Sequence, residues 1–310
     1  MNTSAVAAPA TGLDPRVENL VQGAIDLHCH SGPSVMARYL DHLEAMREAS
    51  EAGLKAVLLK DHYYSATPVT YLLNKHFSNL GVLMLSGVPL NNAVGGLNVH
   101  AVEHGIKLGA RLVWMPTFSS ANHIDHHKQD HKFTDKFPQT KKKMIDPVPL
   151  TVLDAGGKLK EEVKDILDLI AEADVVLSAG HLHISEIWPL FDEARKRGVK
   201  RLLVNHPTYV VDATLDDMKV LARDGVYMEH SMCMWVPGSK FKFYEPEFLR
   251  QIIEAGTVDR TILGSDLGQQ GNPRIVDGFR HVIRTCLDLG YTEAEVRKMT
   301  STNASALMGI

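Results

Sequence analysis

The sequence feature that most constrains the fold is a repeated alternation between short apolar runs and longer amphipathic stretches. From Gly23 onward the chain contains eight apolar runs of strand length, and segments with helical spacing lie between them. Near-continuous apolar strands need cover on both faces, and parallel strands receive it from the helices that connect them. The pattern therefore predicts an α/β fold with parallel strands at 23–29, 54–60, 81–87, 110–116, 174–180, 199–205, 225–231 and 259–265.

The stretches between these strands support the same architecture. Several end at a glycine, which readily adopts the left-handed conformation of a helix C-cap. Eight strand–helix units favour closure into a (β/α)8 TIM barrel, regular or distorted, over an open sheet. No G-x-G-x-x-G follows the first strand, which disfavours a dinucleotide-binding fold. The predicted helices include 37–52, 98–109, 160–173, 184–197, 214–224 and 245–255.

The barrel pattern sets the expected domain organisation. Residues 1–22 have neither the cationic start nor the apolar core of a signal peptide, so we expect a flexible tail. Residues 23–310 then form a single domain, interrupted by a polar, His- and Lys-rich insertion at 117–158 after the fourth strand. That position lies at the rim where barrel enzymes keep their active sites. The insertion is therefore either a lid or substrate-recognition loop, or a solvated excursion.

The charge balance and the cysteines restrict the partners. The chain has 33 Lys+Arg against 37 Asp+Glu and no basic stripe, so no nucleic acid is expected. No apolar run approaches the about 18 residues that cross a bilayer, so no membrane is expected either. The three cysteines are odd in number and far apart, which favours the reducing cytoplasm. The expected partner is a small-molecule substrate, and the sequence is also compatible with a homo-oligomer.

Histidine is the residue type that points to chemistry. The chain has 16 histidines against 8 tyrosines, and imidazole is the commonest metal ligand. The first strand ends with the sequence DLHCH at 26–30. Because side chains alternate faces along a strand, His28 and His30 point the same way, into the mouth of the barrel. Two imidazoles at this spacing can hold one cation.

Other strand ends repeat this theme. Taken singly, each residue has an ordinary structural role open to it, as a hydrogen-bonded core residue or a helix N-cap. Such roles would scatter the residues over strands, helices and loops, whereas here they gather at the carboxyl ends of strands. We therefore expect a metal site there. The residues concerned are Lys60, Asp61 and His62, His181 and His183, Asn205 and His206, Glu229 and His230, and Ser265 and Asp266.

Two pairs of neighbouring residues leave an alternative open. Glu229 and His230 are adjacent and face opposite ways on a strand, so only one can enter the mouth, and we expect His230. After the fifth strand we expect His181, the first residue past the apolar run. His183 takes its place if that strand ends later.

These residues resemble the metal-dependent hydrolases of the amidohydrolase superfamily, and the similarity runs from about residue 24 to the end of the chain. That family has H-x-H at the first strand, one His after each of the fifth and sixth strands, and an Asp after the eighth. The closing stretch 303–309 is also similar to the N-x-A-x-x-x-G that often ends these barrels. The resemblance implies the metal ligands His28, His30, His181, His206 and Asp266.

The first third is also similar to the neighbouring PHP phosphoesterase family, which would add His62 as a ligand. Both patterns are incomplete. The amidohydrolase family often has a carboxylated lysine after the fourth strand, and the PHP family has a Glu after its third strand and a His past its final Asp. At these places the chain has Trp114, Met115 and Pro116, then Pro89 and Gly268.

Lys60 offers a substitute for the missing lysine. It lies two residues before His62 and should share its inward face. A carboxylated Lys60 would bridge two metal ions, whereas an ordinary ammonium would stabilise an oxyanion. We therefore expect one or two ions per chain.

The expected chemistry is hydrolysis. A divalent transition metal, Zn²⁺ first and Mn²⁺ or Fe²⁺ as alternatives, lowers the pKa of bound water from about 15.7 to about 7 and so supplies hydroxide. Asp266 is the expected proton acceptor, and Lys60 or His230 would stabilise the oxyanion as hydroxide attacks a carbonyl. The expected substrates are small amides, cyclic amides, esters or thioesters. A PHP-like phosphoesterase and a non-catalytic metal- or ligand-binding barrel are the alternatives.

The insertion gives one indication of the substrate's charge. Between Ser119 and Pro149 the sequence has six lysines against four aspartates. This surplus of positive charge favours an anionic substrate.

Overall fold

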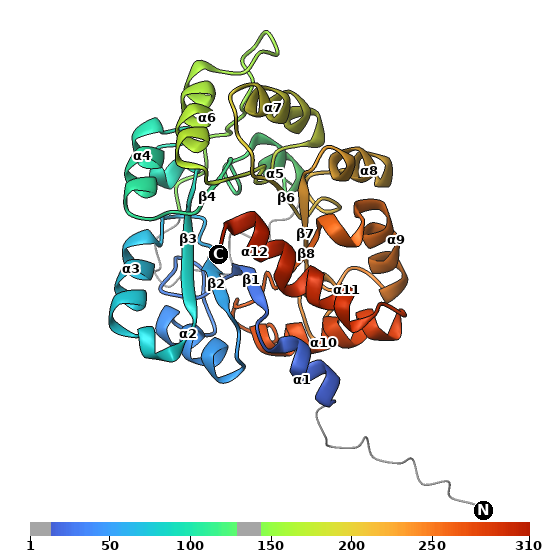
Figure 1. Ribbon diagram of the computed structural model, residues 1–310. Coiled ribbons are helices and arrows are strands. Elements are labelled where there is room, and N and C mark those ends of the chain that lie inside the picture. The colour runs from blue at the N-terminus through green and yellow to red at the C-terminus, as the bar shows by residue number, and fades with distance from the viewer. Residues whose placement is uncertain (1–13, 129–143) are drawn as a thin grey trace, which may run out of the picture.

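The computed structural model describes residues 14–128 and 144–310 and forms the predicted (β/α)8 barrel (Figure 1). Eight parallel strands pair in chain order, each with the next. A parallel bridge between Cys29 and Leu267 joins the first strand to the segment after the last. The strands are β1 (Ile25–Cys29), β2 (Ala56–Leu59), β3 (Leu83–Pro89), β4 (Leu112–Trp114), β5 (Val176–Ser178), β6 (Leu202–Asn205), β7 (Tyr227–Ser231) and β8 (Thr261–Gly264).

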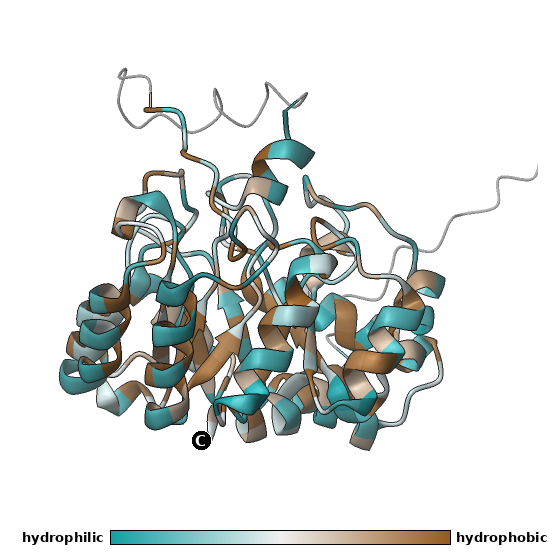
Figure 2. Cartoon of the chain, turned by 90° about the horizontal axis from the view of Figure 1, so that it is seen from above, coloured by the Kyte–Doolittle hydropathy of each residue, from teal (hydrophilic) through white to brown (hydrophobic). Residues whose placement is uncertain are grey.

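The helices surround this barrel. Figure 2 shows apolar strands at the centre and helices whose polar faces turn outward. Within 14–128 and 144–310, no helix is both long and apolar enough to cross a membrane. The helices are α1 (Pro15–Val21), α2 (His42–Glu51), α3 (Thr67–His76), α4 (Val99–Lys107), α5 (Ala121–His126), α6 (Glu161–Ala173), α7 (Ile184–Lys196), α8 (Leu215–Arg223), α9 (Pro246–Gly256), α10 (Ile275–Asp288), α11 (Glu293–Arg297) and α12 (Asn303–Met308).

The observed elements depart from the predicted ranges at two places that affect the mouth. The strand predicted at 81–87 continues to Pro89, because Val88 and Pro89 pair with β4. The helix predicted at 37–52 begins only at His42, because Asp41 caps it and accepts a hydrogen bond from the Glu44 N–H at 2.7 Å. The residues before that cap form a loop over the pocket.

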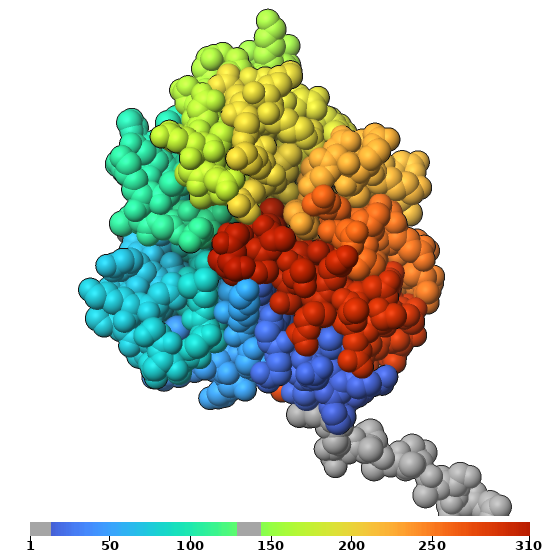
Figure 3. All heavy atoms as spheres, viewed as in Figure 1, coloured from blue at the N-terminus to red at the C-terminus, as the bar shows by residue number. Residues whose placement is uncertain are grey.

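Helix α12 closes the end of the barrel at which the strands begin. Its side chains Leu307 and Met308 are buried against Ile25 and Leu27 of β1 and the other apolar residues inside the barrel. In Figure 3 the C-terminal helices fill the centre of this face. The site must therefore open at the opposite end, where the strands finish.

The N-terminal prediction needs a correction. The expected flexible tail reached residue 22, but Pro15–Val21 form α1 and bury three apolar side chains. Asp14 caps this helix, and Glu18 forms an ion pair with Arg280 of α10 at 2.7 Å. A helix of seven residues, about two turns, is too short for its periodicity to be recognised. Residues 1–13 lie outside the described part of the chain.

The predicted insertion at 117–158 falls partly outside the described residues. Between β4 and α6 the structure describes α5 and then the stretch from 144 to 160, whereas 129–143 are not described. The backbone of Ser119 and Ala121 pairs with Leu150, which joins the two described sides of the segment. The role of this segment as a lid stays a prediction.

Replacing Asn303 by alanine should destabilise the fold. Asn303 is 4% exposed, and its amide donates to the carbonyl oxygens of Val258 and Thr261, both at 2.7 Å. Loss of a buried donor shared by two carbonyls should lower the free energy of unfolding by about 1–3 kcal/mol in urea denaturation. The control Asn19→Ala, at an exposed position of α1, should change it by less than about 0.5 kcal/mol. Equal changes in both variants would contradict this assignment.

Candidate metal centre

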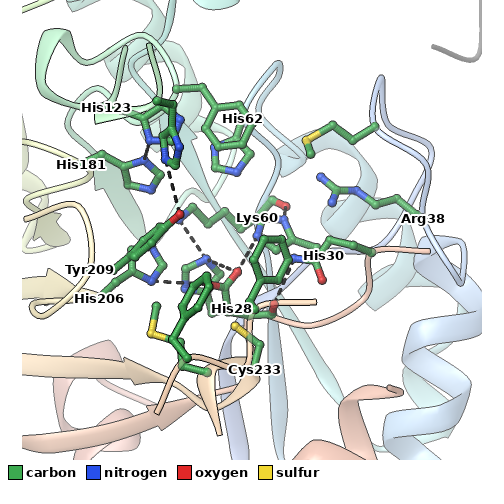
Figure 4. A pocket seen from close by; sticks show the side chains of 18 residues that line it. His28, His30, Arg38, Lys60, His62, His123, His181, His206, Tyr209 and Cys233 are labelled. Atoms are coloured by element: carbon green, nitrogen blue, oxygen red, sulfur yellow. Dashed lines mark hydrogen bonds and ion pairs between the residues drawn. The ribbon is translucent and has the colours of Figure 1, made fainter. Parts of the chain in front are cut away.

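The predicted site residues surround one pocket at the carboxyl ends of the strands (Figure 4). The pocket has about 590 Å³ of empty space, part of it open to solvent. Its polar lining comes mainly from strand ends, and its apolar lining comes from the loops that follow them. The residues predicted from the sequence that line it are His28, His30, Lys60, His62, His181, His206 and Asp266.

The carboxylate of Asp266 lies among three imidazoles. Its Oδ1 is 3.0 Å from His30 Nε2 and 3.3 Å from His28 Nε2, and its Oδ2 is 3.5 Å from His206 Nδ1. One ligand atom from each of His28, His206 and Asp266 lies within 4.8 Å of the others. This spacing is compact enough for the three side chains to hold one ion.

The electrostatics keep these groups in the state that a cation requires. Burial lowers the pKa of His28 and of His30 to about 3, so both imidazoles are neutral near pH 7. Burial alone would raise the pKa of Asp266, but the neighbouring imidazoles hold it well below its usual range. Neutral imidazole and ionised carboxylate are the forms that bind metals.

The imidazoles of β1 are oriented by hydrogen bonds on their far sides. His28 Nδ1 lies 2.6 Å from Glu229 Oε1, and His30 Nδ1 lies 2.9 Å from the Lys60 carbonyl oxygen. Both rings therefore turn Nε2 toward Asp266. Metal-binding histidines typically have such partners, which fix the tautomer and the orientation of the ring.

Lys60 points inward, as predicted. It is 1% exposed, and its Nζ lies 2.9 Å from His28 Nε2 and 5.7 Å from the centre of the Trp114 ring. Burial lowers the pKa of Lys60 to about 8, although the charges of Asp266 and Glu229 oppose this change. The ammonium therefore lies within the same cluster as the imidazoles.

His62 and His181 form the outer part of the cluster. The His62 ring lies 5.3 Å from that of His30 and stacks on Phe118 at 3.6 Å. The His181 ring lies 5.2 Å from that of His206, and its Nε2 is buried without a polar partner among the residues described. His183 instead caps α7 and accepts a hydrogen bond from the Ser185 N–H at 3.2 Å. The structure thus places His181 in the pocket and His183 outside it.

The expectation for β7 was wrong. Glu229 enters the barrel and contacts His28, whereas the adjacent His230 must face the opposite side of the strand. The His230 ring is buried, and neither of its nitrogens has a polar partner within the described ranges. Within the described residues His230 therefore makes no polar contact with the cluster, and Glu229 contacts it instead.

His123 and Arg38 are among the pocket residues that sequence reasoning missed. His123 of α5 lies with its Nδ1 2.9 Å from His181 Nδ1, and Arg38 reaches the pocket from the loop before α2. The density of histidines in the insertion was a signal for His123. Sequence reasoning did not point to Arg38, because the helix predicted at 37–52 included it, whereas α2 begins only at His42.

Similar solved structures define the class of fold. An amidohydrolase from Pseudomonas aeruginosa has a TM-score of 0.63 at 14% identity, over 96% of this chain and 98% of that chain. Dipeptidase AC, a metallopeptidase, has a TM-score of 0.56 at 14% identity, over 93% and 98%. A dihydroxybenzoic acid decarboxylase from Polaromonas sp. JS666, with bound manganese and the inhibitor 2-nitroresorcinol, has a TM-score of 0.52 at 11% identity, over 93% and 97%.

The chain therefore shares its (β/α)8 fold with these three proteins, one of which is an amidohydrolase, and the PHP-like features stay a prediction. Residues 23–229, more than half of the chain, match the model described as "Family of unknown function (DUF6282)", and the chain belongs to this family. The comparison with curated proteins finds no match.

Replacing Glu229 by glutamine should weaken metal binding. Glutamine keeps the size of the side chain but removes the carboxylate that orients His28, so the affinity for Zn²⁺ should fall by about 10–100-fold. Competition against a chromophoric chelator measures this affinity. The control Glu254→Gln, at an exposed position of α9, should bind Zn²⁺ as the unmodified protein does. If both variants retain full affinity, Glu229 does not support a metal ligand.

Proposed function

We propose that the protein is a metal-dependent hydrolase that cleaves an amide, cyclic amide, ester or thioester in a small substrate. The observation that carries this proposal is the Asp266 carboxylate, 3.0 to 3.5 Å from nitrogens of three histidine rings. A carboxylate in this position can serve as a metal ligand and as a proton acceptor. The fold occurs in hydrolases and in a decarboxylase, so the reaction is assigned from the site and not from the fold.

The donor set fits a divalent transition metal. Imidazole and carboxylate suit Zn²⁺, with Mn²⁺ and Fe²⁺ as alternatives. His181 Nε2, buried without a polar partner in the described chain, would be satisfied by an ion. We assign the metal to His28, His30, His206 and Asp266, with His181 and His62 available to complete a site for one or two ions.

The residues of the pocket have distinct roles in this proposal. A divalent ion, when bound, lowers the pKa of water toward neutrality and polarises a carbonyl. Asp266 takes the proton of the attacking water and passes it to the leaving group. Lys60 stabilises the negative charge that develops on the carbonyl oxygen, and His230, which faces away, takes no part. Phe118 and Tyr209 line the pocket and exclude bulk water from it.

Lys60 has a contact that depends on whether the site is loaded. Its Nζ donates to His28 Nε2 at 2.9 Å, while Nδ1 of the same ring faces Glu229. One lone pair cannot accept this hydrogen bond and ligate a metal at the same time. With an ion on His28 Nε2, the Lys60 ammonium would lose this contact and would be available to a substrate oxygen.

The cysteines bear on where the protein works. Cys29, Cys233 and Cys286 are all unpaired and buried. Unpaired thiols are the state that a reducing compartment maintains, so we assign the protein to the cytoplasm.

Removing the metal should abolish hydrolysis, and returning it should restore hydrolysis. Protein purified without chelators should hold one or two equivalents of a transition metal by elemental analysis. After treatment with 1,10-phenanthroline, activity on a panel of p-nitrophenyl esters, anilides, cyclic amides and thioesters should disappear, because the remaining side chains do not activate water at neutral pH. Adding Zn²⁺, Mn²⁺ or Fe²⁺ separately should then identify the metal.

Two outcomes would contradict the proposed function. The metal site would be contradicted if the protein held well under one equivalent of metal and gained neither stability nor activity when metals were added. Hydrolysis of p-nitrophenyl phosphate without activity on the carbonyl panel would favour the phosphoesterase alternative.

Replacing Lys60 by alanine should lower kcat while the protein stays folded and keeps its metal. Loss of one group that stabilises a developing oxyanion costs about 10²–10³ in kcat. The metal content should not fall, because the ammonium competes with the ion for His28. The control Lys219→Ala, at an exposed position of α8, should leave kcat unchanged. Unchanged turnover in Lys60→Ala, with the fold verified by circular dichroism, would reduce Lys60 to a packing residue.

A further inference from the structure

The loop between β1 and α2 is held over the pocket by backbone hydrogen bonds. The Gly32 N–H donates to the Leu40 carbonyl at 2.9 Å, which closes the loop on itself. The Tyr39 N–H donates to the Gly268 carbonyl at 2.8 Å, and the Gln270 N–H donates to that of Ala37 at 3.1 Å. The loop is therefore attached to the segment that follows β8, which also carries Asp266.

Arg38 lies in the middle of this fixed loop, with its side chain only 3% exposed. Its guanidinium has one polar contact within the described residues, a single Nη2 to Asp61 Oδ2 distance of 3.4 Å. Its Nε is buried and has no partner there. A guanidinium has five N–H donors, and a buried cation with so few partners is costly unless something else completes them.

The open side of this guanidinium faces the pocket. Arg38 lines the pocket together with the metal-site residues, and Figure 4 shows its side chain directed toward the cluster on the side of His30. A molecule bound beside the metal ligands would therefore lie within reach of Arg38.

We propose that Arg38 binds a carboxylate of the substrate and so selects small carboxylic acids that carry the bond to be cleaved. The statement that the bound acid is cleaved rests on the proposed function, whereas the statement that Arg38 binds its carboxylate does not. A guanidinium is planar and matches the two oxygens of a carboxylate in a bidentate pair. Much of the remaining lining is apolar or aromatic, with Met36, Phe118, Phe241 and Phe243 beside the polar Gln269. The substrate is then an acid with an apolar or aromatic body.

Binding of matched acids and amides tests this assignment without any turnover. Isothermal titration of the purified protein would compare phenylacetate with phenylacetamide, and hexanoate with hexanamide. The intact protein should prefer each acid to its amide. Arg38→Gln should bind the acids about tenfold to a hundredfold more weakly and the amides equally, because a hydrogen bond to a charged group is lost. Arg38→Lys keeps the charge but loses the planar guanidinium. Its affinity for the acids should lie between those of the intact protein and of Arg38→Gln.

The controls separate a binding role from a structural one. Arg47→Gln, an exposed arginine of α2, should bind all four compounds as the intact protein does. Equal binding of acid and amide by the intact protein, or acid binding that Arg38→Gln leaves unchanged, would overturn the assignment. Tighter binding of inorganic phosphate than of either acid would also overturn it. If Arg38→Gln fails to fold, the acid preference of the intact protein and its reduction in Arg38→Lys decide the question.

This experiment fails or succeeds independently of the proposed reaction. If acid binding depends on Arg38 but no panel compound is hydrolysed, the result would support the Arg38 subsite and contradict the hydrolase function. If the protein hydrolyses panel compounds but shows no preference for acids, the result would support the hydrolase function and contradict the Arg38 subsite.

Discussion

The site depends on the closure of the barrel between β1 and β8. Asp26, fully buried in β1, accepts hydrogen bonds from the Ser265 N–H at 2.8 Å and from its hydroxyl at 2.6 Å. One residue further, the Asp266 N–H donates to the His28 carbonyl at 2.8 Å. These bonds join residues about 239 positions apart in the chain. They bring the carboxylate of Asp266 beside the two imidazoles of β1, so barrel closure and site assembly are the same event.

The backbone adopts uncommon conformations at two strand ends of the site, after β6 and after β8. His206 has φ of +40° and Asp266 has φ of +50°, in the left-handed region that residues other than glycine seldom occupy. Such positions cost of order 1–3 kcal/mol and persist where their surroundings hold them. Past Asp266, a Cβ at Gly268 would come 2.1 Å from the His30 carbonyl oxygen, so only glycine fits. The closed barrel therefore holds both side chains in directions that a relaxed strand end would not give.

The barrel and most of its histidines could be predicted because both follow from strand periodicity. Alternation places His28 and His30 on one face, and the ends of parallel strands meet at one rim. The prediction failed at β7. This strand begins with two apolar residues, so its sequence does not show which residues face the inside of the barrel. Glu229, and not His230, faces the inside of the barrel, where its Oε1 lies 2.6 Å from His28 Nδ1 of β1. A contact between strands so distant in sequence leaves no mark in either segment alone.

The pocket has two kinds of wall, and they differ in how far the sequence predicts them. The strand ends supply imidazoles and a carboxylate, and their positions follow from the fold. The connection after β4 supplies Phe118, whose ring stacks on that of His62 at 3.6 Å, and His123 of α5, whose Nδ1 lies 2.9 Å from His181 Nδ1. These contacts orient the outer imidazoles, and the same layer of loops brings in Arg38. In the proposed function, the strand ends supply the reacting groups and the loops supply contacts to the substrate. Because loop residues have no periodicity, substrate choice depends on the part of the chain that only the folded structure brings together.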